Sequence, residues 1–200
     1  KFIYMKKIAT GLLLALFVSA GVNAQTVEKG DHTINLGFGI DPYHRFSHHH
    51  GVTNHKKGSV GPIVLAYDYI LTDKLGIGRI SVGGILGQSF YNERYATPAH
   101  EYKYNRNRTA IIARAAYHFD IPKAKGLDLY AGVGGGIYIN SSVERTTSIN
   151  GTELKSKSSS TGGAHYVFAG VRYFFTDAFG IYVEAGHGLN AFNGGISFKF

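Results

Sequence analysis

The feature that most constrains this chain is an alternation of apolar with small or polar residues, repeated in eight segments. In one of them, Leu129 and Val133 alternate with Asp128 and Tyr130. This two-residue period is typical of a β-strand with one apolar face. The segments are residues 34–40, 63–69, 79–86, 111–119, 127–140, 166–175, 181–186 and 196–200. Beyond the first two dozen residues, no apolar run reaches the roughly 20 residues of a membrane-spanning helix. A membrane-inserted form would therefore cross with strands.

Residues 1–24 have the layout of a secretory signal peptide. Two basic residues, Lys6 and Lys7, precede a short apolar run, and small residues stand before a cut after Ala24. The run is too short to span a membrane. The alternative is a buried or anchoring N-terminal helix. We expect cleavage and export.

Removal of this leader leaves one mature domain, residues 25–200. Met5 is the expected start of translation, with residues 1–4 upstream of it. Cleavage removes three lysines and no acidic residue, so the formal charge falls from +8 to +5. The sequence has no cysteine, which excludes disulfides, thiolate metal sites and a lipid-modified N-terminal cysteine.

The connectors between the segments alternate in length. The long ones are residues 41–59, 91–107 and 141–161, and the short ones are 72–75, 120–126 and 176–180. An antiparallel up-and-down barrel places alternate connectors at opposite rims, and transmembrane barrels combine an even strand number with short periplasmic turns and longer outer loops. The sequence therefore predicts an all-β, eight-stranded antiparallel up-and-down transmembrane β-barrel with short periplasmic turns and longer extracellular loops.

The alternation alone also fits a soluble barrel such as a lipocalin, which would turn its apolar rows inward. The other rows consist mainly of Gly, Ala, Ser and Tyr with few charges, which suits a narrow barrel interior better than a water-facing surface. A buried charge is stable only when it is paired and hydrogen-bonded. The charges on these rows therefore predict an interior polar network of Asp68, Arg79, Arg114, Asp128, Arg172, Glu184 and Lys199.

Two stretches complete a familiar pattern: IYVEAGHG at residues 181–188 and GGISFKF at residues 194–200. With the leader, the eight segments and the glycine-rich residues 132–136, the chain resembles the small eight-stranded outer-membrane β-barrel family of OmpA-type transmembrane domains and OmpX. The resemblance implies localisation in the cell outer membrane after signal-peptide-dependent export. It also implies that Phe200 is an assembly signal read by the barrel-assembly machinery.

The first long connector is rich in histidine. Imidazoles are common ligands of zinc, copper and nickel, so His48, His49 and His50 are a candidate metal site. Adjacent histidines lack the fixed spacing and carboxylate support of such a site. We interpret the connector as a solvated, basic loop that gains charge between pH 5 and 8, and we expect no metal and no other cofactor.

The three long connectors carry net charges of +2, +1 and +1, which is four of the five net charges of the mature chain. At the outer rim of a barrel, the expected partners are outer-membrane lipid and the phosphates of lipopolysaccharide. Nucleic acid has no access to such a site. We expect a monomer.

Two classes of function fit these residues. The first is a non-enzymatic structural or surface-interaction protein with basic extracellular loops that contact lipopolysaccharide or external partners. The alternatives are a lipid A-modifying enzyme of the deacylase or acyltransferase type, and a narrow channel. A hydrolase needs a nucleophile held by a base, and no serine follows His187 at the spacing such an enzyme would use. We therefore expect no catalytic residues.

Overall fold

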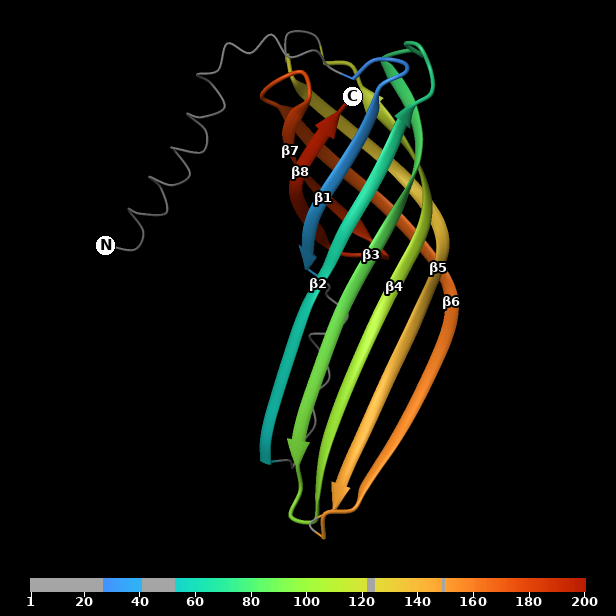
Figure 1. The fold of residues 1–200 in the computed structure, drawn as a ribbon. Coiled ribbons are helices and arrows are strands. Elements are labelled where there is room, and N and C mark those ends of the chain that lie inside the picture. The colour runs from blue at the N-terminus through green and yellow to red at the C-terminus, as the bar shows by residue number, and fades with distance from the viewer. Residues whose placement is uncertain (1–26, 41–52, 122–124, 149) are drawn as a thin grey trace, which may run out of the picture.

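The computed structural model describes residues 27–40, 53–121, 125–148 and 150–200 (Figure 1). Two expectations, the signal peptide and the histidine-rich stretch with His48, His49 and His50, lie outside these residues. Within them, no helix is long and apolar enough to span a membrane.

In the described ranges, eight strands follow one another and close into a barrel. They are β1 (His32–Ile40), β2 (Thr53–Ile70), β3 (Gly78–Ala96), β4 (His100–Phe119), β5 (Leu127–Ser148), β6 (Glu153–Phe174), β7 (Phe179–His187) and β8 (Phe192–Lys199). Each pairs antiparallel with its neighbour in sequence, and β1 pairs with β8 to close the ring. The structure confirms the predicted eight-stranded antiparallel barrel.

The strands differ in length. β2 to β6 have 18 to 22 residues, whereas β1, β7 and β8 have eight or nine. The five long strands continue together past one rim of the barrel, at the bottom of Figure 1. We call this part the outer sheet: residues 53–62, 89–96, 100–108, 140–148 and 153–160. The rim at the other end, where the short connectors lie, is called the turn rim.

Most of the residues for which the sequence predicts long loops belong to the outer sheet. The expected connector 91–107 is strand except for a tight turn, closed by a hydrogen bond from Thr97 N to His100 O at 2.8 Å. The expected connector 141–161 is likewise strand around a turn at Gly151, whose φ is +81°. Beyond the membrane both faces of a sheet meet water, so the apolar alternation ends although the backbone ladder continues. The sequence pattern therefore hides these strand extensions.

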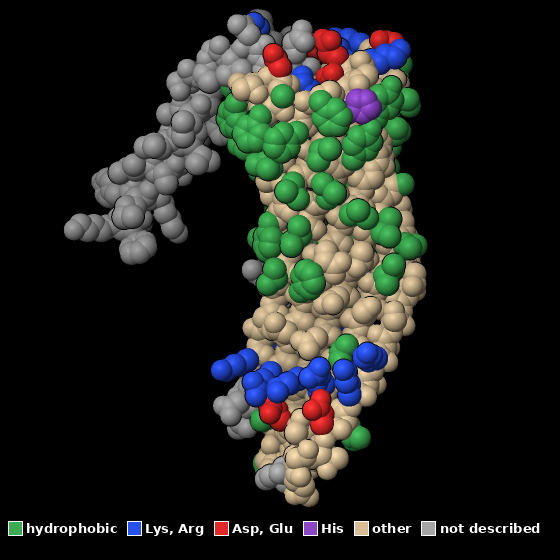
Figure 2. All heavy atoms as spheres, viewed as in Figure 1, with side chains coloured by type: hydrophobic (Ala, Val, Ile, Leu, Met, Phe, Trp, Pro, Cys, Tyr) green, Lys and Arg blue, Asp and Glu red, His purple; other side chains and the backbone are tan. Residues whose placement is uncertain are grey.

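The outward face of the barrel is apolar and exposed. Phe38, Leu86, Val133 and Val183 are 51–60 % exposed, and Figure 2 shows apolar side chains over the wall between the turn rim and a band of cations. Water-soluble monomers rarely expose an apolar surface of this extent. The arrangement is that of a barrel whose outer wall faces lipid.

The inward face combines glycines with tyrosines. The ring of Tyr130 occupies the space above Gly170, where a Cβ atom would come within 2.4 Å of Tyr130 Cζ. Tyr166 lies in the same way over Gly186. Glycine at these inward positions allows large rings to cross a narrow interior.

Candidate functional site: a bridged interior and an outward row of cations

A network of buried charged side chains crosses the barrel interior. Its members lie on the inward face of five different strands, and they are Asp68 on β2, Arg114 on β4, Asp128 on β5, Arg172 on β6 and Glu184 on β7. They are far apart in sequence, and closure of the barrel brings them together. Five of the seven predicted network residues thus lie in one cluster.

Arg114 connects two carboxylates. Its Nε and Nη2 atoms donate to Asp68 Oδ1 and Oδ2 at 2.6 and 2.5 Å, and Nη1 donates to Glu184 Oε2 at 3.1 Å. A bidentate guanidinium–carboxylate contact is among the stronger protein hydrogen-bond arrangements. The guanidinium also lies 4.8 Å from the centroid of the Phe168 ring. Arg114 therefore links β4 to β2 on one side and to β7 on the other.

Arg172 bridges the barrel from wall to wall. Its Nη2 donates to Asp68 Oδ2 at 2.9 Å and its Nη1 to Thr33 Oγ1 at 2.6 Å, while Nε lies 3.6 Å from Asp128 Oδ2. β6 and β2 stand opposite each other in a ring of eight strands. The Arg172–Asp68 contact consequently spans the diameter, which is the filled interior expected of an eight-stranded barrel.

The Glu184 carboxylate accepts hydrogen bonds from several neutral side chains of the interior. Tyr166 donates to its Oε1 at 2.8 Å, Tyr130 donates to its Oε2 at 3.1 Å, and Asn193 Nδ2 lies 3.3 Å from Oε1. With Arg114, four groups satisfy this one buried carboxylate. A buried carboxylate with all its donors in place is a stable member of such a network, whereas Arg172 Nε and Asp128 Oδ2 are buried without a hydrogen-bond partner among the described residues.

Arg79 and Lys199 do not reach this cluster, contrary to the prediction. Both lie on the inward face, but close to the turn rim, where acidic residues of the turns are nearer. Arg79 Nη1 is 3.9 Å from Asp120 Oδ2, and Lys199 Nζ is 3.7 Å from Asp31 Oδ2. The sequence correctly predicts that both side chains face the interior. Their position along the barrel axis decides which acidic residue each one contacts.

Ser81, His118 and Asp128 form a chain that the sequence reasoning did not identify. His118 Nδ1 lies 2.8 Å from Asp128 Oδ1, and Nε2 lies 2.9 Å from Ser81 Oγ. Because a carboxylate only accepts, Nδ1 donates to Asp128, and Nε2 shares a hydrogen bond with the Ser81 hydroxyl. This is the order of a hydrolase triad. On the two-residue period all three residues fall on the inward rows, so strand register was the missing signal.

The triad-like chain is enclosed by the barrel. Ser81 has no exposed surface and His118 is 2 % exposed. The His118 ring stacks on Tyr130 at 5.4 Å between centroids. A lipid outside the barrel has no route to the Ser81 hydroxyl. The chain therefore acts as a hydrogen-bonded support for Asp128 in the interior network.

Phe200 lies at the seam where β8 meets β1. Its backbone N donates to His32 O at 3.0 Å, and its carbonyl accepts from His32 N at 2.9 Å. The Phe200 ring stacks on the His32 ring at 5.5 Å and is otherwise exposed. Its role as an assembly signal stays a prediction.

The outer sheet carries one continuous row of cations on its outward face. Successive cross-strand partners bring one basic residue from each of five neighbouring strands into register. This basic row is Lys56 (β2), Arg94 (β3), Lys103 (β4), Arg145 (β5) and Lys155 (β6). In Figure 2 cations gather in one band below the apolar wall.

Two glutamates partly balance the basic row. Glu101 contacts Arg94 and lies 3.8 Å from Lys103 Nζ, and Glu153 lies 3.8 Å from Arg145 Nε. No ion pair to a described residue is formed by Lys56 or Lys155, which stand at the two ends of the row. The row thus keeps a net positive charge of three.

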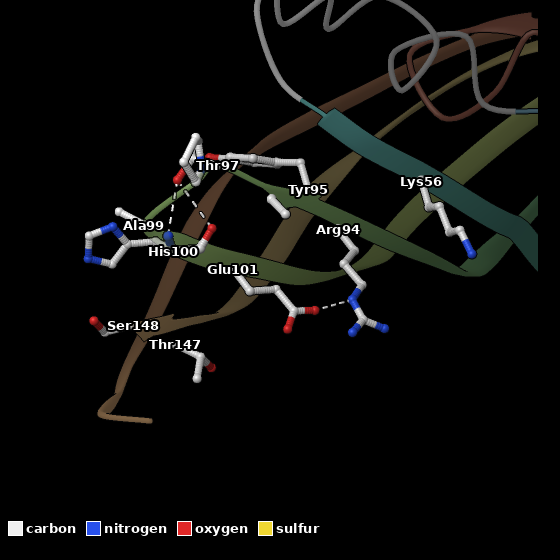
Figure 3. A pocket seen from close by; sticks show the side chains of 11 residues that line it. Lys56, Arg94, Tyr95, Thr97, Ala99, His100, Glu101, Thr147 and Ser148 are labelled. Carbon is white, nitrogen blue, oxygen red and sulfur yellow. Dashed lines mark hydrogen bonds and ion pairs between the residues drawn. The ribbon is translucent and has the colours of Figure 1, made fainter. Parts of the chain in front are cut away.

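A surface hollow of about 680 Å³ lies at the tip of β3 and β4, beside the start of the basic row. Figure 3 shows the Arg94–Glu101 pair on these two strands and Lys56 on the neighbouring β2. His100 N is held by Thr97 Oγ1 at 3.2 Å in the turn. The tip therefore offers a positively charged, partly concave surface.

The inward face of the outer sheet holds two acidic residues that already have partners. Glu93 is bonded by His55 at 2.5 Å and by the Tyr91 hydroxyl at 2.8 Å. Burial by itself would raise the pKa of Glu93, but these bonds and the nearby Lys57 lower it below its usual value. Tyr104 donates to Glu144 at 2.7 Å, and its hydrogen bonds with Tyr95 and Glu144 raise the pKa of Tyr104.

No group of three or more His, Asp or Glu side chains in the described ranges is placed to hold a metal ion. The histidine-rich stretch with His48, His49 and His50 lies outside those ranges. The interior cluster instead places its carboxylates against guanidiniums.

A family model for the outer membrane protein beta-barrel domain matches residues 10–199, almost the whole chain. The chain belongs to this family of outer-membrane β-barrel proteins. Membership places the barrel in the cell outer membrane. A comparison with curated protein sequences finds no match.

Two solved structures are similar to this barrel. One is Ail, the attachment invasion locus protein of Yersinia pestis, with 13 % sequence identity, a TM-score of 0.41, and coverage of 86 % of this chain and 99 % of that one. The other is the N-terminal β-barrel domain of Pseudomonas aeruginosa OprF, with 18 % identity, a TM-score of 0.37, and coverage of 87 % of this chain and 100 % of that one.

Proposed function

We propose that this outer-membrane barrel is a non-enzymatic protein that holds the outer sheet at the cell surface, where the basic row binds phosphate groups of lipopolysaccharide. The observation that carries the proposal is the alignment of five cations across five strands. Like charges directly opposite each other destabilise a sheet. A polyanion lying along the row would remove this repulsion.

The height of the row suits contact with lipid headgroups. Phe90 is the last large apolar residue on the outward face of β3, and Arg94 follows four residues later. At about 3.3 Å per residue this separation is roughly 13 Å along the strand, and less along the membrane normal because barrel strands tilt. The cations are therefore expected just outside the hydrocarbon layer, at the level of anionic headgroups.

The interior supports a structural role over the alternatives. Arg172 and Asp68 join opposite walls at 2.9 Å, which argues against a channel at that level. The buried Ser81 argues against a lipid A-modifying hydrolase built on the Ser81–His118–Asp128 chain.

Neutralising the two ends of the basic row tests the proposal. In K56Q/K155Q, lipopolysaccharide should bind about thirtyfold more weakly, since each cation near an anionic surface contributes about 1 kcal/mol. The measurement is a titration of the full chain in detergent micelles with purified lipopolysaccharide, repeated at higher salt, where the difference should shrink.

The matched control removes the same charge at the opposite end of the barrel. K74Q/K125Q lies at the turn rim and should bind lipopolysaccharide as the unchanged protein does. Equal losses in both variants would show a general charge effect and would contradict the proposed site. The lipid A mass spectrum of expressing cells should be unchanged, and loss or gain of an acyl chain would support the enzymatic alternative.

A further inference from the structure

The inward face of the outer sheet carries two arginines with spare hydrogen-bond donors. Arg108 Nε donates to Asn140 Oδ1 at 2.9 Å, and its guanidinium lies 4.7 Å from the centroid of the Tyr138 ring. Its Nη atoms donate to no described residue, and Arg106 forms no ion pair or hydrogen bond with one. Contacts with the Tyr138 ring and the Asn140 amide thus hold Arg108 in place, while its Nη donors remain available to a ligand.

Strand register surrounds these arginines with hydroxyl and amide groups. Arg106 pairs across the sheet with Ser142, which pairs with Ser158, and Arg108 pairs with Asn140, which pairs with Ser160. The two rows are adjacent on one face because they are two residues apart on every strand. Together they line a hollow of about 270 Å³.

The hollow has the chemistry of an oxyanion site. Guanidiniums present several N–H donors in a fixed fork, and hydroxyl and amide groups add further donors. No Asp or Glu lines it. The two acids on the same face are already bonded, Glu93 by Tyr91 and His55, and Glu144 by Tyr104. An entering anion therefore meets two positive charges and no lining carboxylate.

We propose that this hollow binds the phosphate group of a phosphorylated saccharide. Its volume lies below the usual range for a drug-sized ligand, which suits one phosphate group with part of its sugar. The serine and asparagine groups around the arginines can exchange hydrogen bonds with sugar hydroxyls, which a free phosphate does not offer. The site lies on the inward face, so it is separate from the basic row of the proposed function.

The test uses the full chain in detergent micelles titrated with glucose 6-phosphate, glucose and inorganic phosphate. Glucose 6-phosphate should bind saturably, glucose should not bind, and inorganic phosphate should bind at least about tenfold more weakly. Equal binding of inorganic phosphate would overturn the saccharide part of the proposal, and no saturable binding of either phosphate would overturn the site.

Variants separate this site from the basic row. R106Q/R108Q should weaken glucose 6-phosphate binding by at least about tenfold, while K155Q/K157Q, with the same loss of charge on the outward face of β6, should leave it unchanged. The two pairs should behave in the opposite way toward lipopolysaccharide, where K155Q/K157Q weakens binding. Similar losses of glucose 6-phosphate in both pairs would contradict the proposal.

A third variant guards against a folding defect. Ser158→Leu fills the hollow from an exposed position of β6 and removes a donor without changing charge. It should keep heat-modifiable migration in electrophoresis, the mark of a folded barrel, and lose glucose 6-phosphate binding by a similar factor. A folded Ser158→Leu protein with unchanged affinity would overturn the assignment of this hollow.

Discussion

Replacing Arg114 by alanine is expected to lower the free energy of unfolding by about 3–5 kcal/mol, because it leaves the buried Glu184 carboxylate without a cation and removes the two-atom contact with Asp68. Arg114 donates to Asp68 through two atoms and to Glu184 through a third. Arg172 remains near Asp68, but the Glu184 carboxylate then keeps only neutral donors. The loss should appear when the protein, folded into lipid vesicles, is unfolded with urea. The folded fraction is measured by its heat-modifiable electrophoretic migration.

Arg79→Ala is the matched control. Arg79 also lies on the inward face, but its ion pair with Asp120 is at 3.9 Å near the turn rim, where both side chains are partly exposed. Ion pairs of this kind contribute about 1 kcal/mol or less. Equal effects of the two alanine variants would mean that the central network does not carry the stability assigned to it.

Gly170→Val is expected to have the second largest effect, a destabilisation on the order of 4 kcal/mol. A Cβ at residue 170 would come within 2.4 Å of the Tyr130 ring, so the ring must move. Overpacking of this kind costs about 1–3 kcal/mol. Displacing Tyr130 also removes its hydrogen bond to Glu184 and its contact with the Arg172 guanidinium, and leaving buried groups without partners costs about 1–3 kcal/mol more.

Gly162→Val provides the comparison on the same strand. No atom lies within 4 Å of a Cβ placed at Gly162, so the variant should fold and unfold as the unchanged protein does, within about 0.5 kcal/mol. Both variants are measured by the same urea unfolding in vesicles. If Gly170→Val matched Gly162→Val, the packing of Tyr130 against the β6 backbone would not support the network.

The barrel itself could be predicted from sequence because membrane strands combine two environments. Lipid on one side and a narrow interior on the other impose a two-residue period, seen in residues such as Leu129 and Val133 against Asp128 and Tyr130. The outer sheet has water on both sides, so the period is absent in residues 140–148 and 153–160. The sequence therefore predicts loops where these strands lie.

The contacts within the barrel depend on register, which the period does not determine. The sequence predicts that Asp68, Arg114 and Arg172 face the interior. Whether they contact one another across the barrel depends on the stagger between the strands. Because the period does not determine register, the sequence also predicts Arg79 and Lys199 in the network, which they do not reach. The same limit explains why the net charge of the outer connectors was predicted, while the alignment of the basic row was not.

We expect the apolar wall of this barrel to lie in lipid and the outer sheet to stand outside the cell. Because the sequence has no cysteine, a single introduced cysteine is the only thiol of the protein that a maleimide can label. The variants are Asn105→Cys in the outer sheet, Val133→Cys on the apolar wall and Thr176→Cys at the turn rim. A membrane-impermeant maleimide on intact cells should label only the first.

Thr176→Cys should become labelled once the outer membrane is permeabilised, and Val133→Cys only after the protein is denatured. Each protein is detected by its mass shift in electrophoresis after labelling. That order of labelling is the result predicted by a barrel with the turn rim in the periplasm. Labelling of Val133→Cys or Thr176→Cys on intact cells to the extent seen for Asn105→Cys would contradict it.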